Sequence, residues 1–81
     1  MNNKIPLFRT LDLNLSAVLV SLDAKIEKIE KNQKGKSLFY FKQSKELNSI
    51  IEKYWKQELK VNPQTLFNSL KFIKNRIYSS Y

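Results

Sequence analysis

The chain has no cysteine and no histidine, and only one glycine and two prolines among its 81 residues. The missing thiols and imidazoles exclude disulfide scaffolds, zinc fingers, thiol nucleophiles and histidine general bases. One glycine cannot form a glycine-rich phosphate loop. The seven carboxylates are scattered: Glu27 and Glu30 lie among lysines on an exposed segment, Glu52 suits a helix-surface pair with Lys56, and Asp12 and Glu46 suit first helical turns. We therefore expect a protein that is not an enzyme and uses no cofactor, metal or small-molecule substrate.

Long hydrophobic runs are also missing. No stretch approaches the roughly 20 apolar residues that a membrane span requires. The apolar run 13–22 contains Asn14 and two serines and has no cleavage motif after it, which argues against a signal peptide. A hydrophobic content of 42% is too high for a disordered chain. We expect one cytoplasmic domain over 1–81, frayed at 1–4 and without a membrane segment.

Negative charge is scarce, because fifteen basic residues face seven acidic ones and the formal net charge is +8. Residues 62–81 contain three basic side chains and no acid. A field of this sign attracts nucleic acid. However, the basic residues are nearly all lysines, and a lysine-rich composition also arises from an AT-rich genome without any role in binding. Solvated surface lysines and a true binding surface both remain open interpretations.

The N-terminal third predicts a short strand and a helix. Residues 5–9 suit an extended segment, and Pro6 restricts it to the edge of a sheet. Thr10 or Asp12 can cap a helix over 12–22. Apolar residues cover this helix almost all the way round. Such a helix is either enclosed in the core or buried against another molecule.

The middle of the chain has two competing interpretations. Residues 37–42 (SLFYFK) are typical of a strand, and 25–31 supply a partner through a turn in which Gly35 takes the left-handed conformation. The alternative is a long helix, because Leu22, Ile26 and Ile29 keep helical spacing. We favour the antiparallel hairpin, since an isolated strand would leave its backbone groups unpaired.

Two further helices are predicted over 45–58 and 63–78. Ser44 caps the first, and Asn62 followed by proline begins the second. Trp55 and Phe67 fall on their apolar stripes, so we expect them to fill the core rather than to form a stacking platform for bases. The two helices should pack together across the hairpin. The prediction is a small α+β domain of order β-α-β-β-α-α.

Four segments of the chain resemble a family of short proteins catalogued only as a domain of unknown function and found in bacterial, archaeal and viral genomes. The segments are 10–17 (TLDLNLSA), 39–41 (FYF), 54–63 with its YW and LKVNP motifs, and 66–78. The resemblance implies an α+β fold with a central hairpin, but no activity and no functional residues. Similar proteins tend to have a glycine before an aromatic residue where this chain has Asp23 and Ala24.

The leading functional hypothesis is an accessory module that binds DNA or RNA, mainly through the phosphate backbone. If the last two helices form a helix-turn-helix, Gln64 and Asn68 can reach bases while Lys71, Lys74 and Arg76 contact phosphates. The simpler alternative is the ordinary polar face of an amphipathic helix. The hairpin would add further cations, namely Lys25, Lys28, Lys34, Lys36 and Lys42.

Tyr40 alternates with Phe39 and Phe41 along the predicted strand. If helices cover one sheet face only, one of these two sets is exposed. An exposed Tyr40 between Lys36 and Lys42 would suit a single strand of nucleic acid. The alternative is that the N-terminal helix covers it.

The alternative function is a protein-interaction or assembly subunit, with a homodimer as one form. Leu13 and Val20 lie on the second apolar side of the first helix, and Phe72 lies off the stripe of the last helix. Together they suggest more apolar surface than one small core can cover. The opposing interpretation is that residues 78–81 cover Phe72.

Overall fold

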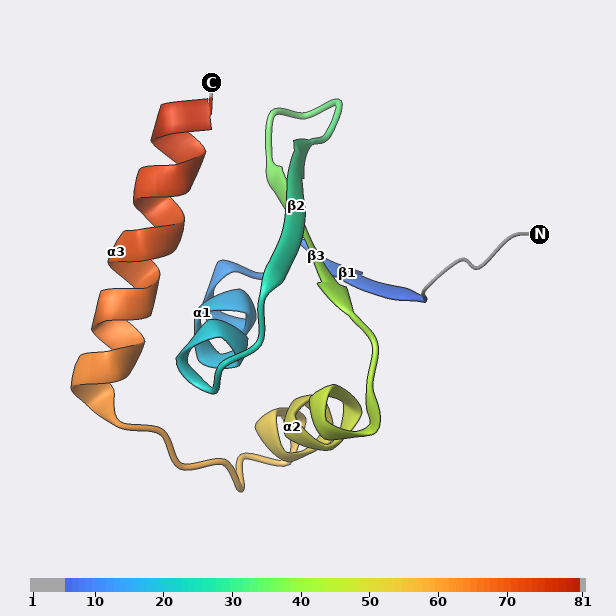
Figure 1. Cartoon of the computed structure of the whole chain (residues 1–81), viewed down its shortest axis with the longest axis vertical. Coiled ribbons are helices and arrows are strands. Elements are labelled where there is room, and N and C mark those ends of the chain that lie inside the picture. The colour runs from blue at the N-terminus through green and yellow to red at the C-terminus, as the bar shows by residue number, and fades with distance from the viewer. Residues whose placement is uncertain (1–5, 81) are drawn as a thin grey trace.

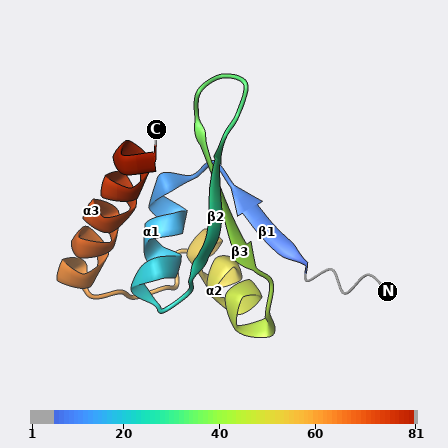
Figure 2. The same ribbon diagram turned by 45° about the horizontal axis from the view of Figure 1, so that its top comes forward.

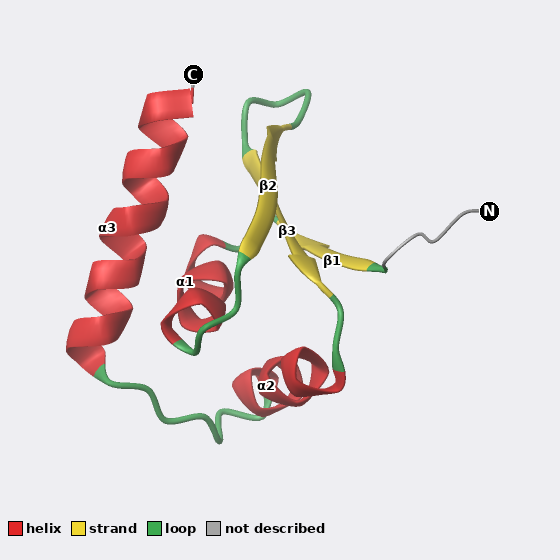
Figure 3. Cartoon of the chain, viewed as in Figure 1, coloured by secondary structure: helices red, strands yellow, loops and turns green. Residues whose placement is uncertain are grey.

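The computed structural model describes residues 6–80, so the expected fraying of 1–4 lies outside the described residues. Six elements follow in the predicted order β-α-β-β-α-α (Figure 1, and by type of element in Figure 3). Their bounds are β1 (Leu7–Thr10), α1 (Leu13–Ser21), β2 (Ile26–Lys31), β3 (Ser37–Lys42), α2 (Lys45–Trp55) and α3 (Pro63–Ser80). The α+β fold is confirmed.

The three strands form one antiparallel sheet in the order β1-β3-β2. The hairpin of β2 and β3 is therefore confirmed, and the long-helix alternative is wrong. β1 is an edge strand, as predicted, and it begins at Leu7; Ile5 of the predicted segment lies outside the described residues. Pro6 has no N–H to donate, and its carbonyl instead accepts a hydrogen bond from the N–H of Gln43 at 3.0 Å.

Alternation along β3 separates the two faces of the sheet. Phe39 and Phe41 are buried in the hydrophobic core with Leu15 and Leu19 of α1. Tyr40 belongs to the opposite face of the sheet. Leu47 of α2 and Ile73 of α3 belong to the same core cluster, so all three helices lie on the phenylalanine side of the sheet; Figure 2 shows their arrangement around it. The core therefore forms between β3 and α1.

α1 lies between the sheet and α3 in both views, and its residues from Leu15 to Leu19 are all buried. The sequence predicts that this helix is either enclosed in the core or buried against another molecule. The structure shows that it is enclosed in the core. Asp12 caps it, because an oxygen of its carboxylate accepts a hydrogen bond from the Leu15 N–H at 3.1 Å.

Asp23 ends α1 in the left-handed conformation, with φ of 73°. The N–H of Ala24 donates to the carbonyl of Leu19 at 2.9 Å, and the N–H of Asp23 donates to that of Val20 at 3.0 Å. These two bonds form a helix-ending motif that usually has glycine at the left-handed position. A glycine, which similar proteins tend to have at this point of the chain, would adopt the left-handed conformation of Asp23 without strain.

α2 ends at Trp55, earlier than the predicted residue 58, for the same kind of reason. Gln57 adopts a φ of 60°, and the N–H of Glu58 donates to the carbonyl of Lys53 at 3.0 Å. The left-handed residue stops the helix and turns the chain away from its axis. Residues 56 and 57 form the turn, and 58–62 connect it to α3 without helix or strand structure.

The predicted packing of α2 against α3 is wrong. α3 packs mainly against α1, with Cα atoms of the two helices within 8 Å, whereas α2 and α3 make little contact. A helix-turn-helix requires its two helices to pack as a unit, so that interpretation is also wrong.

Among residues 6–80, no helix is long and apolar enough to cross a membrane, including the 18-residue α3.

Candidate nucleic-acid interface

α3 begins at a well-formed cap. The side-chain oxygen of Asn62 accepts a hydrogen bond from the Thr65 N–H at 3.1 Å, and Pro63 is the first helical residue. Leu70 and Ile73 face the core from one side of this helix. The opposite side carries an exposed polar strip at helical spacing: Gln64, Asn68, Lys71 and Asn75. This strip is the polar face of an amphipathic helix, which is the simpler interpretation of these residues from the sequence.

Three aromatic side chains of α3 are also exposed. Phe67 is 60% exposed, Phe72 50% and Tyr78 75%. Phe67, Lys71, Lys74 and Tyr78 follow one another at i, i+4, i+7 and i+11 and lie along one side of the helix. The prediction that Phe67 fills the core is wrong, because α2 does not pack against this side of α3.

Trp55 is also exposed, by 65%, although the sequence predicts it in the core. It ends α2, where its ring meets Tyr54 edge to face with centroids 5.1 Å apart. Tyr54 packs against the core and Trp55 does not. The apolar stripe of α2 therefore stops one residue before Trp55.

A shallow recess of about 560 Å³ lies at the N-terminal half of α3. Phe67 supplies an apolar wall, and Lys71 supplies a positive charge. The remaining lining residues are polar or small: Asn62, Pro63, Gln64 and Asn68. The recess combines an exposed ring, amide groups and a cation, which is a composition suited to a nucleotide.

A second recess, of about 430 Å³, lies where the C-terminal half of α3 meets the end of α1 and the start of β2. Phe72 and Arg76 line it from α3, and Lys25 lines it from the other side. The Arg76 guanidinium carbon lies 5.9 Å from the centroid of the Phe72 ring. Val20 and Ile26 contribute to the apolar part of the lining. Asp23 is the acidic residue at this recess.

This second recess combines residues that the sequence assigns to different functions. Arg76 and Lys25 are predicted phosphate contacts, whereas Val20 and Phe72 are predicted partner contacts. The third predicted partner residue, Leu13, packs against the core elsewhere on α1. Val20 also packs against the core, so Phe72 is the half-exposed member of the predicted partner set.

Tyr40 lies on the sheet face away from the helices, yet it is only 9% exposed. Its hydroxyl donates to an oxygen of Glu30 at 2.6 Å, and the Lys28 nitrogen lies 4.6 Å from the ring centroid. Lys28 also pairs with Glu30 at 3.3 Å. The hydrogen bond from Tyr40, and then that of Lys28, lower the pKa of Glu30. Side chains of β2, rather than a helix, thus cover the ring that we considered for base stacking.

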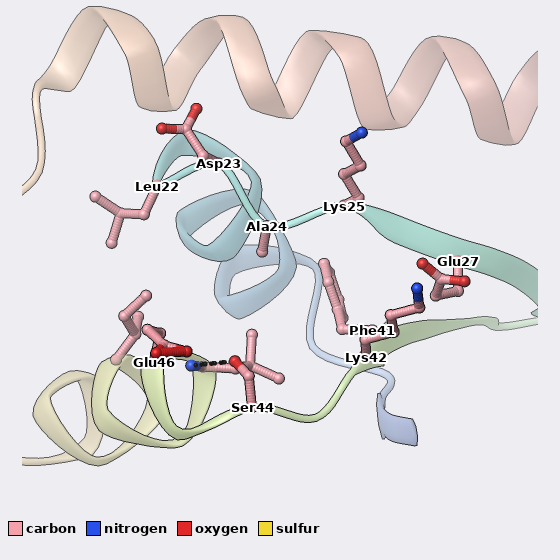
Figure 4. A pocket seen from close by; sticks show the side chains of 11 residues that line it. Leu22, Asp23, Ala24, Lys25, Glu27, Phe41, Lys42, Ser44 and Glu46 are labelled. Atoms are coloured by element: carbon pink, nitrogen blue, oxygen red, sulfur yellow. Dashed lines mark hydrogen bonds between the residues drawn. The ribbon is translucent and has the colours of Figure 1, made fainter. Parts of the chain in front are cut away.

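The hairpin lysines do not gather at one place. Lys34 and Lys36 lie by the turn, beside a hollow lined also by Leu11 and Asn32. Lys42 lies at a different pocket of about 320 Å³, between the end of α1 and the start of α2 (Figure 4). Carboxylates share that pocket with Lys42, namely Asp23, Glu27 and Glu46.

The pocket of Figure 4 has an apolar interior that includes Phe41, and a rim of mixed charge. A mixed rim attracts a polyanion less than an acid-free surface does. Within residues 6–80, no group of three or more acidic side chains is placed to hold a metal ion. We therefore place the candidate interface on α3, with Lys25 at its edge because this residue lines both the pocket of Figure 4 and the second recess, and leave Lys36, Lys42 and Tyr40 outside it.

A family model described as a domain of unknown function (DUF5659) matches residues 6–79. The chain belongs to this family. The match spans all six elements except the last residue of α3, so the α3 surface is part of the family's domain. Searches of curated proteins and of solved structures gave no match.

Proposed function

We propose that this domain is a non-enzymatic module that binds nucleic acid through phosphate contacts on the outer surface of α3. The observation that carries the proposal is the acid-free cationic surface of this helix. Lys71 and Lys74 are both exposed, and residues 62–81 contain no carboxylate side chain that could neutralise them. No other described element lies on the far side of α3 from α1 (Figures 1 and 2).

The binding is expected to depend on charge more than on base sequence. Lysine ammonium groups attract phosphates as point charges, whereas specific base contacts favour the fixed geometry of arginine. Gln64 and Asn68 add amides beside the lysines. They support polar contacts, but without a helix-turn-helix nothing directs α3 into a groove in the manner of that motif. Affinity should therefore fall steeply with salt.

The double substitution Lys71→Glu and Lys74→Glu should weaken binding to a fluorescein-labelled oligonucleotide by more than about tenfold at roughly 50 mM salt, measured by fluorescence anisotropy. The slope of log affinity against log salt should also decrease in magnitude by about two, because two phosphate contacts are removed.

The matched control is Lys45→Glu with Lys53→Glu, which makes the same change in net charge on α2. Both lysines are exposed, and they belong to a different helix from the proposed interface. If both double variants lose the same affinity for the oligonucleotide, the loss is explained by the change in net charge alone. That result would contradict a binding site on α3. An unmodified chain that binds no oligonucleotide at 50 mM salt would contradict the proposal itself.

The alternative function is a protein-interaction or assembly subunit, and the exposed apolar rings favour it. Phe72 presents half of its surface beside the partly buried Val20. If this patch self-associates, the mass measured by light scattering should rise with concentration, and Phe72→Glu should abolish the rise without changing the circular dichroism. The control is Trp55→Glu. A constant monomer mass at high concentration would contradict a homodimer.

A further inference from the structure

We infer that the α3 surface takes unpaired bases, so that the ligand is single-stranded nucleic acid rather than a duplex. This inference rests on the proposed function and adds the class of ligand. It uses the two recesses on α3, each of which combines an exposed aromatic ring with a cation. Phe67 and Lys71 form the first pair. In the second recess Phe72 lies with Lys25 and Arg76, whose two positive charges outnumber the single carboxylate of Asp23.

The exposed rings call for a ligand with flat apolar faces. Phe67 and Phe72 keep half or more of their surface in water, which phosphate contacts alone would not require. Bases of a single strand can stack on aromatic side chains or on guanidinium planes. The second recess offers both, because the guanidinium of Arg76 lies over the Phe72 ring. Duplex bases already stack on one another and do not offer their faces to these rings.

The spacing of the two rings also favours an extended strand. Phe72 follows Phe67 by five positions, which corresponds to about 7.5 Å along the helix axis and about 140° of rotation around it. This distance is more than twice the rise of about 3.4 Å between neighbouring bases of a duplex strand. The rotation places the two rings further apart than this axial distance alone, so bases held in the two recesses cannot be stacked on each other. Lys71, between the two rings in sequence, can then meet the phosphates that connect them.

The charge of the surface argues against a second copy of this chain as the occupant. Pairing two α3 surfaces would bring lysine against lysine, with no acid in residues 62–81 to compensate. An acidic protein segment without aromatic side chains would match the charge, but it would leave the exposed rings without flat partners. Single-stranded nucleic acid satisfies both the cations and the rings.

The test compares three fluorescein-labelled probes of equal length: a twelve-nucleotide oligothymidylate, a twelve-residue abasic deoxyribose-phosphate strand, and a twelve-base-pair duplex. The oligothymidylate is expected to bind about tenfold more tightly than either other probe, because only it offers unpaired bases. Equal binding of all three would overturn the inference and leave the phosphate proposal standing. No binding of any probe would overturn both.

Substitutions then locate the stacking. Phe67→Ala and Phe72→Ala should each weaken oligothymidylate binding about fivefold or more while leaving the abasic strand and the salt slope unchanged. Trp55→Ala removes an equally exposed ring outside α3 and should change nothing. If the three variants behave alike, the rings of α3 do not stack on bases. Displacement of the oligothymidylate by polyglutamate at equal charge concentration would likewise overturn the inference.

Discussion

Phe41→Ala is expected to destabilise the domain by about 3–5 kcal/mol, because it removes a large buried side chain and leaves a cavity. Phe41 is completely buried and lies in the central strand, opposite Phe8 of β1 and Ile26 of β2. A chain of this length has a total stability of about 4–12 kcal/mol. The variant should therefore be largely unfolded at 37 °C, or unfold at a much lower urea concentration by circular dichroism.

Phe67→Ala is the matched control, because it deletes the same atoms from an exposed position. Its cost should stay within about 1 kcal/mol, since surface substitutions away from the core change stability little. For both variants, the midpoint of urea unfolding and the slope of the unfolding free energy against urea concentration should be compared. A changed slope would show a change in the surface exposed on unfolding. Equal destabilisation by the two variants would mean that Phe67 is buried, contrary to the fold described above.

Local signals in the sequence predicted the elements and their order correctly. The caps at Asp12, Ser44 and Asn62 are all present, with each side chain accepting a backbone N–H of the first turn. Gly35 has the expected positive φ, 80°. These features depend on contacts between residues close in sequence. The helix ends at Asp23 and Gln57 were harder to predict, because neither residue is the glycine that usually marks a left-handed helix end.

Packing between helices could not be predicted in the same way. Periodicity shows which side of a helix is apolar, but not which element covers that side. Trp55 and Phe67 both adjoin genuine core stripes, and their exposure follows from α3 packing on α1 instead of α2. To predict that side chains of β2 cover Tyr40, one would need to know the register of the hairpin. This register places Lys28 opposite Tyr40, next to a bulge in β2.

The candidate interface was predictable in part. The outward strip of α3 followed from helical spacing, and its lack of acids is visible in the sequence. The helical spacing of Phe67, Lys71, Lys74 and Tyr78 indicates that they share one side of α3. This pattern was overlooked because Phe67 was assigned to the core. The presence of Lys25 at one recess with Phe72 and Arg76 was not predictable, because it brings the connection between α1 and β2 next to α3.

Ile73→Ala should loosen α3 from the rest of the domain and lower the free energy of unfolding by about 2–5 kcal/mol. Ile73 is the completely buried apolar residue of α3, and it belongs to the same core cluster as Leu15 and Ala17 of α1. Lys74→Ala, one residue further on at an exposed position, is the control and should cost less than about 0.5 kcal/mol. Urea unfolding followed by circular dichroism measures both.

The same variant tests how far the candidate interface depends on docking of α3. The first recess is built from α3 and its cap, whereas the second also needs Lys25, Val20 and Ile26 from α1, β2 and their connection. Hydrogen exchange in Ile73→Ala should therefore accelerate in α3 more than in β3, since local opening requires mainly the contacts with α1 to break. Oligothymidylate binding should weaken even at temperatures where the sheet is intact. Uniform acceleration across α3 and β3 would show instead that helix and sheet open only together, as one cooperative unit.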